Sequence, residues 1–274
     1  MTFESSLEFA KKMDAHDPLN SFREKFIFPN FHEKEIIYFT GNSLGLQPKS
    51  TRTMIEEELD DWAKFGVEGH FMSRRPWYSY HEQLTELSAY VVGAKPIETV
   101  VTHSLTTNIH LLMVSFYQPQ GKRTKILCEK KAFPSDQYAL MSQLEFHGYD
   151  EAHLIEVGPR EGEETIRHED ILKAIKDNQD ELALVFMGGV NYYTGQFFDL
   201  KAITDAGQKA GAIVGFDLAH AAGNVNLALH DWGIDFATWC SYKYLNSSPG
   251  GVSGIFVHEK HADNSNLKRF AGWW

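Results

Sequence analysis

Short apolar runs and helix-length patterns alternate along most of this chain. The runs lack a polar residue at every second position, which is typical of strands buried on both faces of a parallel sheet. Helical patterns separate most of the earlier runs, for example at 134–147, 168–178 and 200–211. The alternation predicts an α/β fold, a three-layer sandwich with a mostly parallel sheet. The runs expected to form strands are 99–102, 125–128, 153–157, 182–186, 213–216, 236–239 and 254–257.

The first part of the chain has a different pattern. An acidic helical opening leads to the turn-rich sequence GNSLGLQP at 41–48. Two helices are expected after it, one with apolar residues at helical spacing over 54–65 and one over 78–92. We therefore expect an N-terminal segment at 1–50 and a large domain at 51–274. The chain stops at AGWW without a final helix or polar tail, which indicates a chain cut before its natural end.

Composition narrows the class of protein. The chain is 43% hydrophobic and 23% charged, as in soluble globular proteins, and its net charge of −11 argues against a nucleic-acid binder. Its two cysteines, Cys128 and Cys240, lie in apolar runs, so we expect buried thiols in a reducing compartment. The charged N-terminus is no secretory signal, and no apolar run approaches the roughly 20 residues of a membrane span. These features indicate a cytoplasmic protein.

Polar side chains follow four of the expected strands. In open α/β sheets, ligands bind beyond the carboxyl ends of the strands, so these side chains are candidates for one site. Each segment alone is a weak signal, because helix caps and exposed lysines are common. The candidates are Asp217 and His220 after 213–216, Tyr242 and Lys243 after 236–239, HSLTTN (103–108) after 99–102, and KKAFPSD (130–136) after 125–128.

The set meets the requirements of pyridoxal 5′-phosphate (PLP). This cofactor needs a lysine amine for its aldehyde and a carboxylate that keeps its pyridine nitrogen protonated. Its phosphate needs hydroxyls and backbone amides at a helix N-terminus, and its ring needs an aromatic cover. The chain offers Lys243, Asp217, Ser104 with Thr106, and Phe133 for these four tasks.

Several segments closely resemble kynureninases. The resemblance runs in unbroken order from about residue 20 to the end of the chain. It implies a fold-type-I PLP enzyme, of the aminotransferase class V-like superfamily, that hydrolyses L-kynurenine or 3-hydroxykynurenine to anthranilate or 3-hydroxyanthranilate and L-alanine. It also implies a homodimer, in tryptophan catabolism on a route to NAD. The matching segments are VGFDLAHAAGNVNLALHDWGIDFATWCSYKYLN (214–246), GNSLGLQP (41–48), GHFMSRRPW (69–77), SLTTNIHLL (104–112), KAFPSDQYA (131–139), NYYTGQFFDL (191–200) and AGWW (271–274).

The resemblance also assigns roles to single residues. It implies that Lys243 is the Schiff-base lysine, that Asp217 pairs with the pyridine nitrogen, and that Tyr242 reaches the phosphate and donates a proton. Ser43 and His70 match positions near the substrate. Further cofactor contacts implied in this way are Leu105, Thr106, Phe133, Pro134, Ser135, Asp136, His220 and, across a dimer interface, Trp273.

The chain departs from the family pattern in two places. Gly188 stands where serine is expected in some relatives, so one polar contact is missing or is supplied by a neighbour. The family's C-terminal small domain, which carries an asparagine near the substrate and an arginine for the substrate carboxylate, is absent from this chain.

Three alternatives stay open. Another class V PLP enzyme, such as a cysteine desulfurase or an aminotransferase, is the first, although a desulfurase needs a mobile cysteine. A non-catalytic PLP-binding fragment is the second. A metal hydrolase is the third, prompted by thirteen histidines. The segments HAAGNVNLALH (220–230) and HEKH (258–261) lack a third ligand at a known spacing, so scattered surface histidines explain them better and no metal is expected.

Overall fold

The computed structural model describes residues 3–272, and their contacts group them into two compact units. The first unit ends at Tyr78 and the second begins at Ser79. The functional division expected after residue 50 stays a prediction. Each unit is described by itself below. In residues 3–272, no helix is both long enough and apolar enough to cross a membrane.

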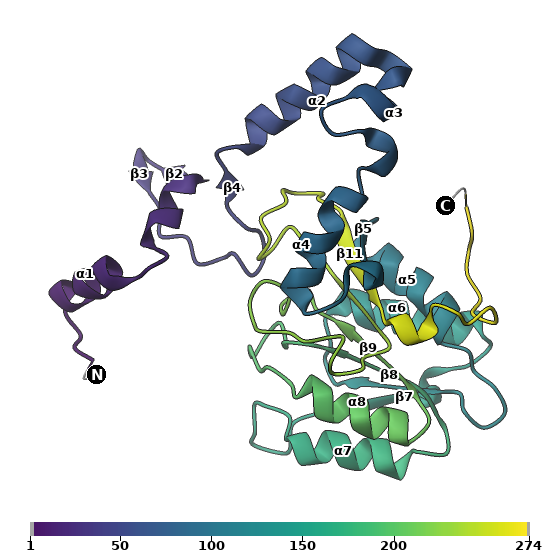
Figure 1. The fold of residues 1–274 in the computed structure, drawn as a ribbon. Helices are drawn as coiled ribbons and strands as arrows, with labels where there is room; N and C mark the ends of the chain where they lie inside the picture. The colour runs from purple at the N-terminus through teal and green to yellow at the C-terminus, as the bar shows by residue number, and fades with distance from the viewer. Residues whose placement is uncertain (1–2, 273–274) are drawn as a thin grey trace. The chain divides into compact units, whose positions relative to one another are not determined.

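The second unit is built on a seven-stranded sheet (Figure 1). Every strand expected from the sequence is present, and each bound lies within two residues of the expected one. The strands are β5 (Thr99–Thr102), β6 (Lys125–Glu129), β7 (Leu154–Val157), β8 (Leu182–Gly188), β9 (Ile213–Asp217), β10 (Phe236–Trp239) and β11 (Ser253–Val257).

The strand order across the sheet is β5-β11-β10-β9-β8-β6-β7. β11 runs antiparallel to both of its neighbours, and all the other strands run in one direction. The carboxyl ends of β5, β6, β9 and β10 therefore lie at the same edge. Because these are the strands followed by candidate site residues, the sheet brings the four polar segments to one edge, as the sequence predicted.

Helices cover both faces of the sheet (Figure 1). α5 and α6 pack on one face and α7 and α8 on the other, which confirms the three-layer α/β fold. The helices of this unit are α4 (Glu82–Val92), α5 (Leu105–Phe116), α6 (Pro134–Phe146), α7 (His168–Asp177) and α8 (Leu200–Lys209).

The apolar character of the strands follows from this layering. Leu184 and Phe186 of β8 pack in the cluster beneath α5 and α6, and Val185 and Met187 pack in the cluster beneath α7 and α8. Since successive side chains of a strand point to opposite faces, a strand covered on both faces is apolar at most of its positions. The missing polar alternation in the sequence has this cause.

The first unit consists of short elements. The helix expected over 54–65 is present as α2, and Arg75 forms ion pairs with Glu57 and Glu58 near its middle. The helices and strands of the first unit are α1 (Leu7–His16), β1 (Phe26–Ile27), β2 (Asn30–Phe31), β3 (Lys34–Glu35), β4 (Gln47–Pro48), α2 (Thr51–Phe65) and α3 (Gly69–Met72).

Short 3₁₀ turns occur in both units. They cover Asn20–Lys25, Gly66–Glu68, Trp77–Ser79, Pro96–Glu98, Glu151–His153 and Glu259–His261.

A buried carboxylate joins the turn before β5 to the turn after β11. Glu98 accepts hydrogen bonds from the backbone amides of Lys95 (2.8 Å) and Glu259 (2.9 Å), and His230 Nδ1 lies 2.9 Å from its Oε1. Burial alone would raise the pKa of the Glu98 carboxyl, but these hydrogen bonds hold it below its usual value. A depressed pKa in the folded state means that ionised Glu98 stabilises the fold above the pKa of the unfolded chain.

We expect Glu98→Gln to lower the free energy of unfolding by about 1–3 kcal/mol at pH 7, because the amide cannot accept all of these bonds. The difference from wild type should shrink as pH falls through the depressed pKa, where Glu98 itself becomes protonated. Urea unfolding between pH 3 and pH 7 measures it. Glu86→Gln, at an exposed position on α4, is the matched control. A difference that stays constant with pH would exclude the ionised carboxylate as its source.

Candidate functional site

A cavity of about 290 Å³ opens at the carboxyl ends of β5, β9 and β10. Eight of the eleven expected cofactor contacts line it, and they come from segments more than 100 residues apart in sequence. A small adjoining hollow is lined by Asp136, Asp217 and His220, among others. The eight residues are Leu105, Thr106, Phe133, Ser135, Asp217, His220, Tyr242 and Lys243.

Lys243 is buried in the turn that follows β10, with only 8% of its surface exposed. Its Nζ lies 2.8 Å from His220 Nε2 and 5.6 Å from the centre of the Phe133 ring. Burial, followed by the charge of Lys243, lowers the pKa of His220 to about 4. The imidazole is therefore neutral near pH 7, and we assign the Lys243 amine as donor to its Nε2. This hydrogen bond holds the Lys243 amine in the cavity, where it lies between the Phe133 ring and the His220 imidazole.

Asp217 ends β9 as a buried carboxyl group. Its Oδ1 accepts a hydrogen bond of 2.7 Å from the Ala219 amide, and its side chain is hydrogen-bonded to that of Asp136 in the first turn of α6. Burial raises the pKa of both carboxyls. Oδ1 of Asp136 is buried and lacks a hydrogen-bond partner in the described part of the chain. An acid pair with spare acceptor capacity suits a ligand that presents a protonated ring nitrogen.

The N-terminus of α5 forms the other end of the cavity. Ser104 caps the helix by accepting a hydrogen bond from the Thr107 amide, so the helix begins at Leu105 as HSLTTN predicted. The first amides of a helix have no acceptor within the helix, and the helix dipole favours an anion there. Thr106 Oγ1 lies 2.9 Å from Ser135 Oγ, which brings two hydroxyls from different helices together. This end is suited to a phosphate group.

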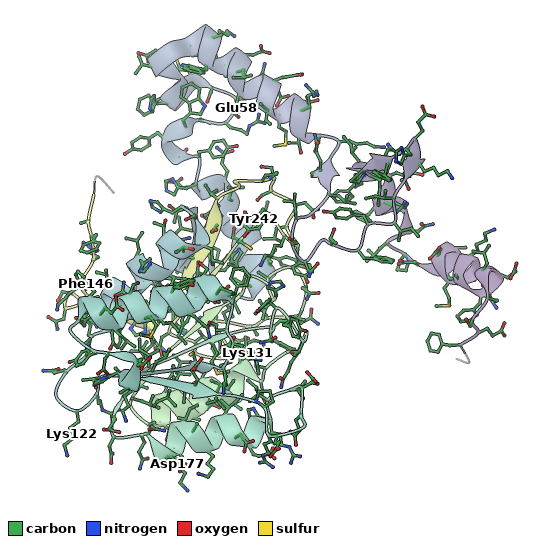
Figure 2. All side chains as sticks on the ribbon, turned by 180° about the vertical axis from the view of Figure 1, so that it is seen from behind. Glu58, Lys122, Lys131, Phe146, Asp177 and Tyr242 are labelled. Atoms are coloured by element: carbon green, nitrogen blue, oxygen red, sulfur yellow. The ribbon has the colours of Figure 1, made fainter. Side chains whose placement is uncertain are left out.

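Tyr242, labelled in Figure 2 close to β11, lines the same cavity. Burial raises the pKa of its phenol to about 12, so Tyr242 is protonated at neutral pH. A protonated phenol at the cavity wall is a hydrogen-bond donor to an anion and a source of a proton.

Asp136 lines the adjoining hollow, and four expected site residues remain, of which Ser43 and His70 belong to the first unit and are described within it alone. Ser43 and His70 lie exposed in the first unit, where His70 Nδ1 is 2.7 Å from the Val67 carbonyl oxygen. Their expected place near the substrate stays a prediction. Pro134 is the first residue of α6 and does not line the cavity, and Trp273 lies outside the described residues.

Two groups at the site were missed by the sequence analysis. Glu129 and Tyr192 line the small hollow together with Asp136 and Asp217. The expected strand ended at Cys128, whereas β6 runs one residue further, and Glu129 is only 3% exposed. A charged residue directly after an apolar run is usually exposed at the end of a strand, so its type alone gave no signal.

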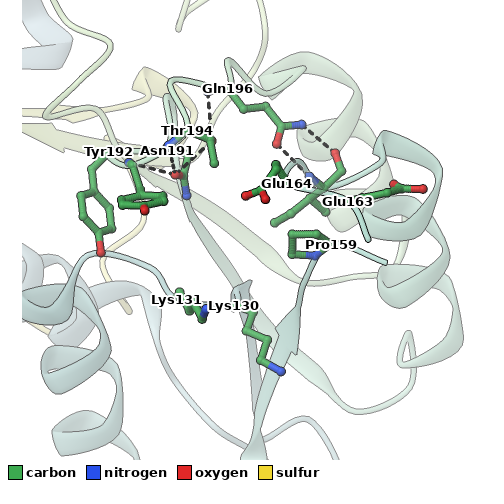
Figure 3. A pocket seen from close by; sticks show the side chains of 11 residues that line it. Lys130, Lys131, Pro159, Glu163, Glu164, Asn191, Tyr192, Thr194 and Gln196 are labelled. Atoms are coloured by element: carbon green, nitrogen blue, oxygen red, sulfur yellow. Dashed lines mark hydrogen bonds between the residues drawn. The ribbon is translucent and has the colours of Figure 1, made fainter. Parts of the chain in front are cut away.

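A larger cavity, of about 480 Å³, lies beside the hollow and shares Tyr192 with it (Figure 3). Figure 3 shows Lys130 and Lys131 on one side of it and Glu163 and Glu164 on another. Both lysines are exposed, and no buried titratable group lines this cavity in the described chain. We therefore place the site in the smaller cavity, where buried charged groups converge.

The two cysteines are buried, as expected. Cys128 lies inside β6 and Cys240 directly follows β10. Burial raises the pKa of both thiols, which keeps them protonated and unreactive. These are poor properties for a mobile catalytic cysteine.

The histidines of 220–230 and 258–261 are not all scattered. The structure brings His230 and His258 together with Glu98, close enough for the three to share a metal ion. Hydrogen bonds already occupy these atoms, however. His258 Nδ1 accepts from the Lys260 amide at 3.1 Å, and His258 Nε2 lies 3.2 Å from the His230 carbonyl oxygen. The cluster is accounted for as a structural network.

Comparison with solved structures supports the fold. A cysteine desulfurase from Thermococcus onnurineus aligns with a TM-score of 0.65 and 18% identity, over 96% of this chain and 60% of that one. A cystine C–S lyase in complex with cysteine persulfide aligns with a TM-score of 0.71 and 16% identity, over 86% of this chain and 60% of that one. At these identities, the likeness extends to the fold alone.

Comparison by sequence is more specific. The kynureninase of Flavobacterium johnsoniae is 61% identical over the whole chain, and that of Myxococcus xanthus is 57% identical over 99% of it. The chain covers 65% and 64% of these two relatives, respectively. The resemblance to kynureninases is thus confirmed. The family model for aminotransferase class-V matches residues 37–271, and the chain therefore belongs to the aminotransferase class-V family.

Proposed function

We propose that this chain carries the PLP site of a kynureninase, which hydrolyses L-kynurenine or 3-hydroxykynurenine to anthranilate or 3-hydroxyanthranilate and L-alanine. The observation that supports this most is the convergence of Lys243, His220 and Asp217 in one cavity, in a chain 61% identical to a kynureninase. The resemblance further supports a cytoplasmic homodimer that acts in tryptophan catabolism, on a route to NAD.

The cavity offers a partner for each part of PLP. Lys243 would hold the aldehyde, Asp217 the ring nitrogen, and the first turn of α5 the phosphate, with Tyr242 as a further donor. Phe133 would cover the ring. When bound, PLP supplies an electron sink that makes bonds next to the substrate's amino carbon easier to break.

The residues around Lys243 are suited to moving protons. Lys243 Nζ would take the proton from the substrate's Cα, and neutral His220 would orient the amine through its Nε2. Tyr242, protonated at neutral pH, would return a proton to Cβ of the alanine fragment.

The overall reaction consumes one water. Its oxygen adds to the side-chain carbonyl carbon, Cγ, and the Cβ–Cγ bond breaks, so that the aromatic half leaves as a carboxylate and the other half leaves as alanine. Ser43 and His70 are proposed to lie near the substrate, since they match family positions there.

A second candidate is a PLP-binding chain without kynureninase activity. The chain spans about 65% of the length of the kynureninases that it matches, so the activity of those proteins is a proposal for this chain. A cysteine desulfurase is disfavoured, because both thiols are buried with raised pKa values.

The test is an absorption spectrum of the purified chain with PLP, before and after addition of L-kynurenine. A new visible band of bound PLP, followed by fluorescent anthranilate and an equal amount of alanine, is the expected result. A band without product would select the second candidate. If no band forms, the PLP site itself is wrong.

A further inference from the structure

A third buried carboxyl lies behind the acid pair of the site. Glu129, at the carboxyl end of β6, is 3% exposed, and its Oε1 and Oε2 lie 3.0 Å and 3.1 Å from the amide nitrogen of Gly188 on β8. Nothing in the mechanism above uses this side chain. A buried carboxyl held only by backbone amides, its own and that of Gly188, and by no cationic side chain is costly unless its position serves a purpose.

Gly188 makes room for this carboxyl. A Cβ atom at position 188 would lie 2.8 Å from Glu129 Oε1, closer than a methyl group and an oxygen can approach without one of them shifting. In the sheet, Gly188 stands in register with Asp217 on the neighbouring strand β9. Glycine here, in place of the serine expected in some relatives, thus allows the Glu129 carboxyl to lie beside the acid pair.

The charged groups around Glu129 come from several elements. Asp136 of α6, Asp217 of β9 and His220 line the same hollow, and Lys243 lies 2.8 Å from His220. Burial raises the pKa of Glu129 to about 7, and the charge of Asp217 acts in the same direction, while hydrogen bonds from the backbone amides of Glu129 itself and of Gly188 oppose both. Near neutral pH, Glu129 therefore changes between its neutral and its ionised form.

We propose that Glu129 is a positioning residue of the cofactor site, which in its ionised form strengthens the hold of Asp217 on a protonated ring nitrogen. The negative charge of Glu129 would attract a positive ring nitrogen held by Asp217, because the Glu129 carboxyl lines the same hollow as Asp217. The inference rests on the proposed PLP site and adds a residue to it. It implies that the affinity of the site for the cofactor increases as pH rises through neutrality, because Glu129 becomes ionised over this range.

The test compares PLP affinity of the whole chain and its Glu129→Gln variant by absorbance titration at pH 6 and pH 8.5. Glutamine keeps the shape and one acceptor for Gly188 but carries no charge. We expect the ratio of the two affinities to favour wild type about tenfold more at pH 8.5 than at pH 6, the factor that corresponds to one unit of pKa change. Glu156→Gln, on the neighbouring strand β7 at an exposed position, should keep the wild-type ratio at both pH values.

A ratio that does not change with pH, whatever its size, would overturn the proposal and leave Glu129 a structural role only. If wild type itself fails to bind PLP, the proposed function fails, and this role of Glu129 fails with it. If wild type binds PLP but the ratio of the two affinities is the same at both pH values, only the role of Glu129 is overturned and the proposed PLP site stands.

A measurement without cofactor and a second variant distinguish the proposed role of Glu129 from a loss of affinity caused by misfolding. Because the pKa of Glu129 is raised in the folded state, its ionisation costs stability as pH rises through about 7, and Glu129→Gln lacks this cost. The melting temperature of the variant should therefore gain on wild type between pH 6 and pH 8.5. Gly188→Ala keeps Glu129 but displaces its carboxyl, and it should lose part of the pH-dependent affinity gain. If Gly188→Ala keeps the whole gain in affinity, the position of the Glu129 carboxyl is not the source of that gain.

Discussion

Replacing Lys243 by alanine is expected to abolish covalent attachment of PLP and to lower turnover of L-kynurenine by at least about a thousandfold. The lysine has two proposed tasks, to bind the aldehyde and to move the proton at Cα, and loss of a general base alone costs about 10²–10⁴-fold. Noncovalent contacts of the cavity remain in the variant, so it should still bind PLP, more weakly than wild type.

Borohydride reduction followed by mass spectrometry measures the attachment directly. Wild type should gain one phosphopyridoxyl group on the peptide that contains Lys243, and the corresponding peptide of the variant should gain none. Lys131→Ala is the matched control, because Lys131 is exposed and lies outside this cavity. Labelling of Lys243→Ala at another lysine to the wild-type extent would show that the covalent site is elsewhere.

Asp217→Asn is expected to separate stability from function. Asparagine has almost the same shape but cannot carry the negative charge that keeps a ring nitrogen protonated. We expect turnover to fall about 10²–10³-fold, the usual cost of removing one electrostatic contact from a transition state. PLP affinity should fall as well.

The stability of the protein without cofactor should not fall in this variant. Burial raises the pKa of Asp217 in the folded state, so its ionisation costs stability as pH rises, and this cost is absent from the variant. Asp217→Asn should therefore melt no lower than wild type at pH 8. Asp231→Asn, at an exposed position, is the control. A variant that melts far lower would mean that Asp217 acts mainly in the fold.

Much of the fold could be predicted because the strands are covered on both faces. In β8, and in β9 up to Phe216, both sides of the strand are covered by apolar layers, so each strand appears in the sequence as an apolar run. The edge at which Asp217 and Lys243 meet followed from the parallel order, since polar residues come directly after these runs.

The remaining features depend on contacts between segments distant in sequence. Glu129 is buried because Gly188 of another strand leaves room for it, and no local pattern records that space. Asp136 follows an ordinary helix start, and only the fold brings its carboxyl to Asp217. The division at Tyr78 likewise reflects which residues contact each other in space, and helical spacing along 54–65 gives no sign of it.

The antiparallel strand β11 has a consequence for the order in which the chain acquires its structure. β5 pairs in the sheet with β11 only, with Thr102 opposite Ser253, so the first strand of the unit depends on the last one. During synthesis, β5 leaves the ribosome about 150 residues before its partner and has no place in the sheet until then. Closing so long a loop is slow, and strand edges exposed in the meantime favour aggregation. α5 follows β5 directly, so the segment that forms the phosphate end of the cavity begins beside a strand whose partner is synthesised much later.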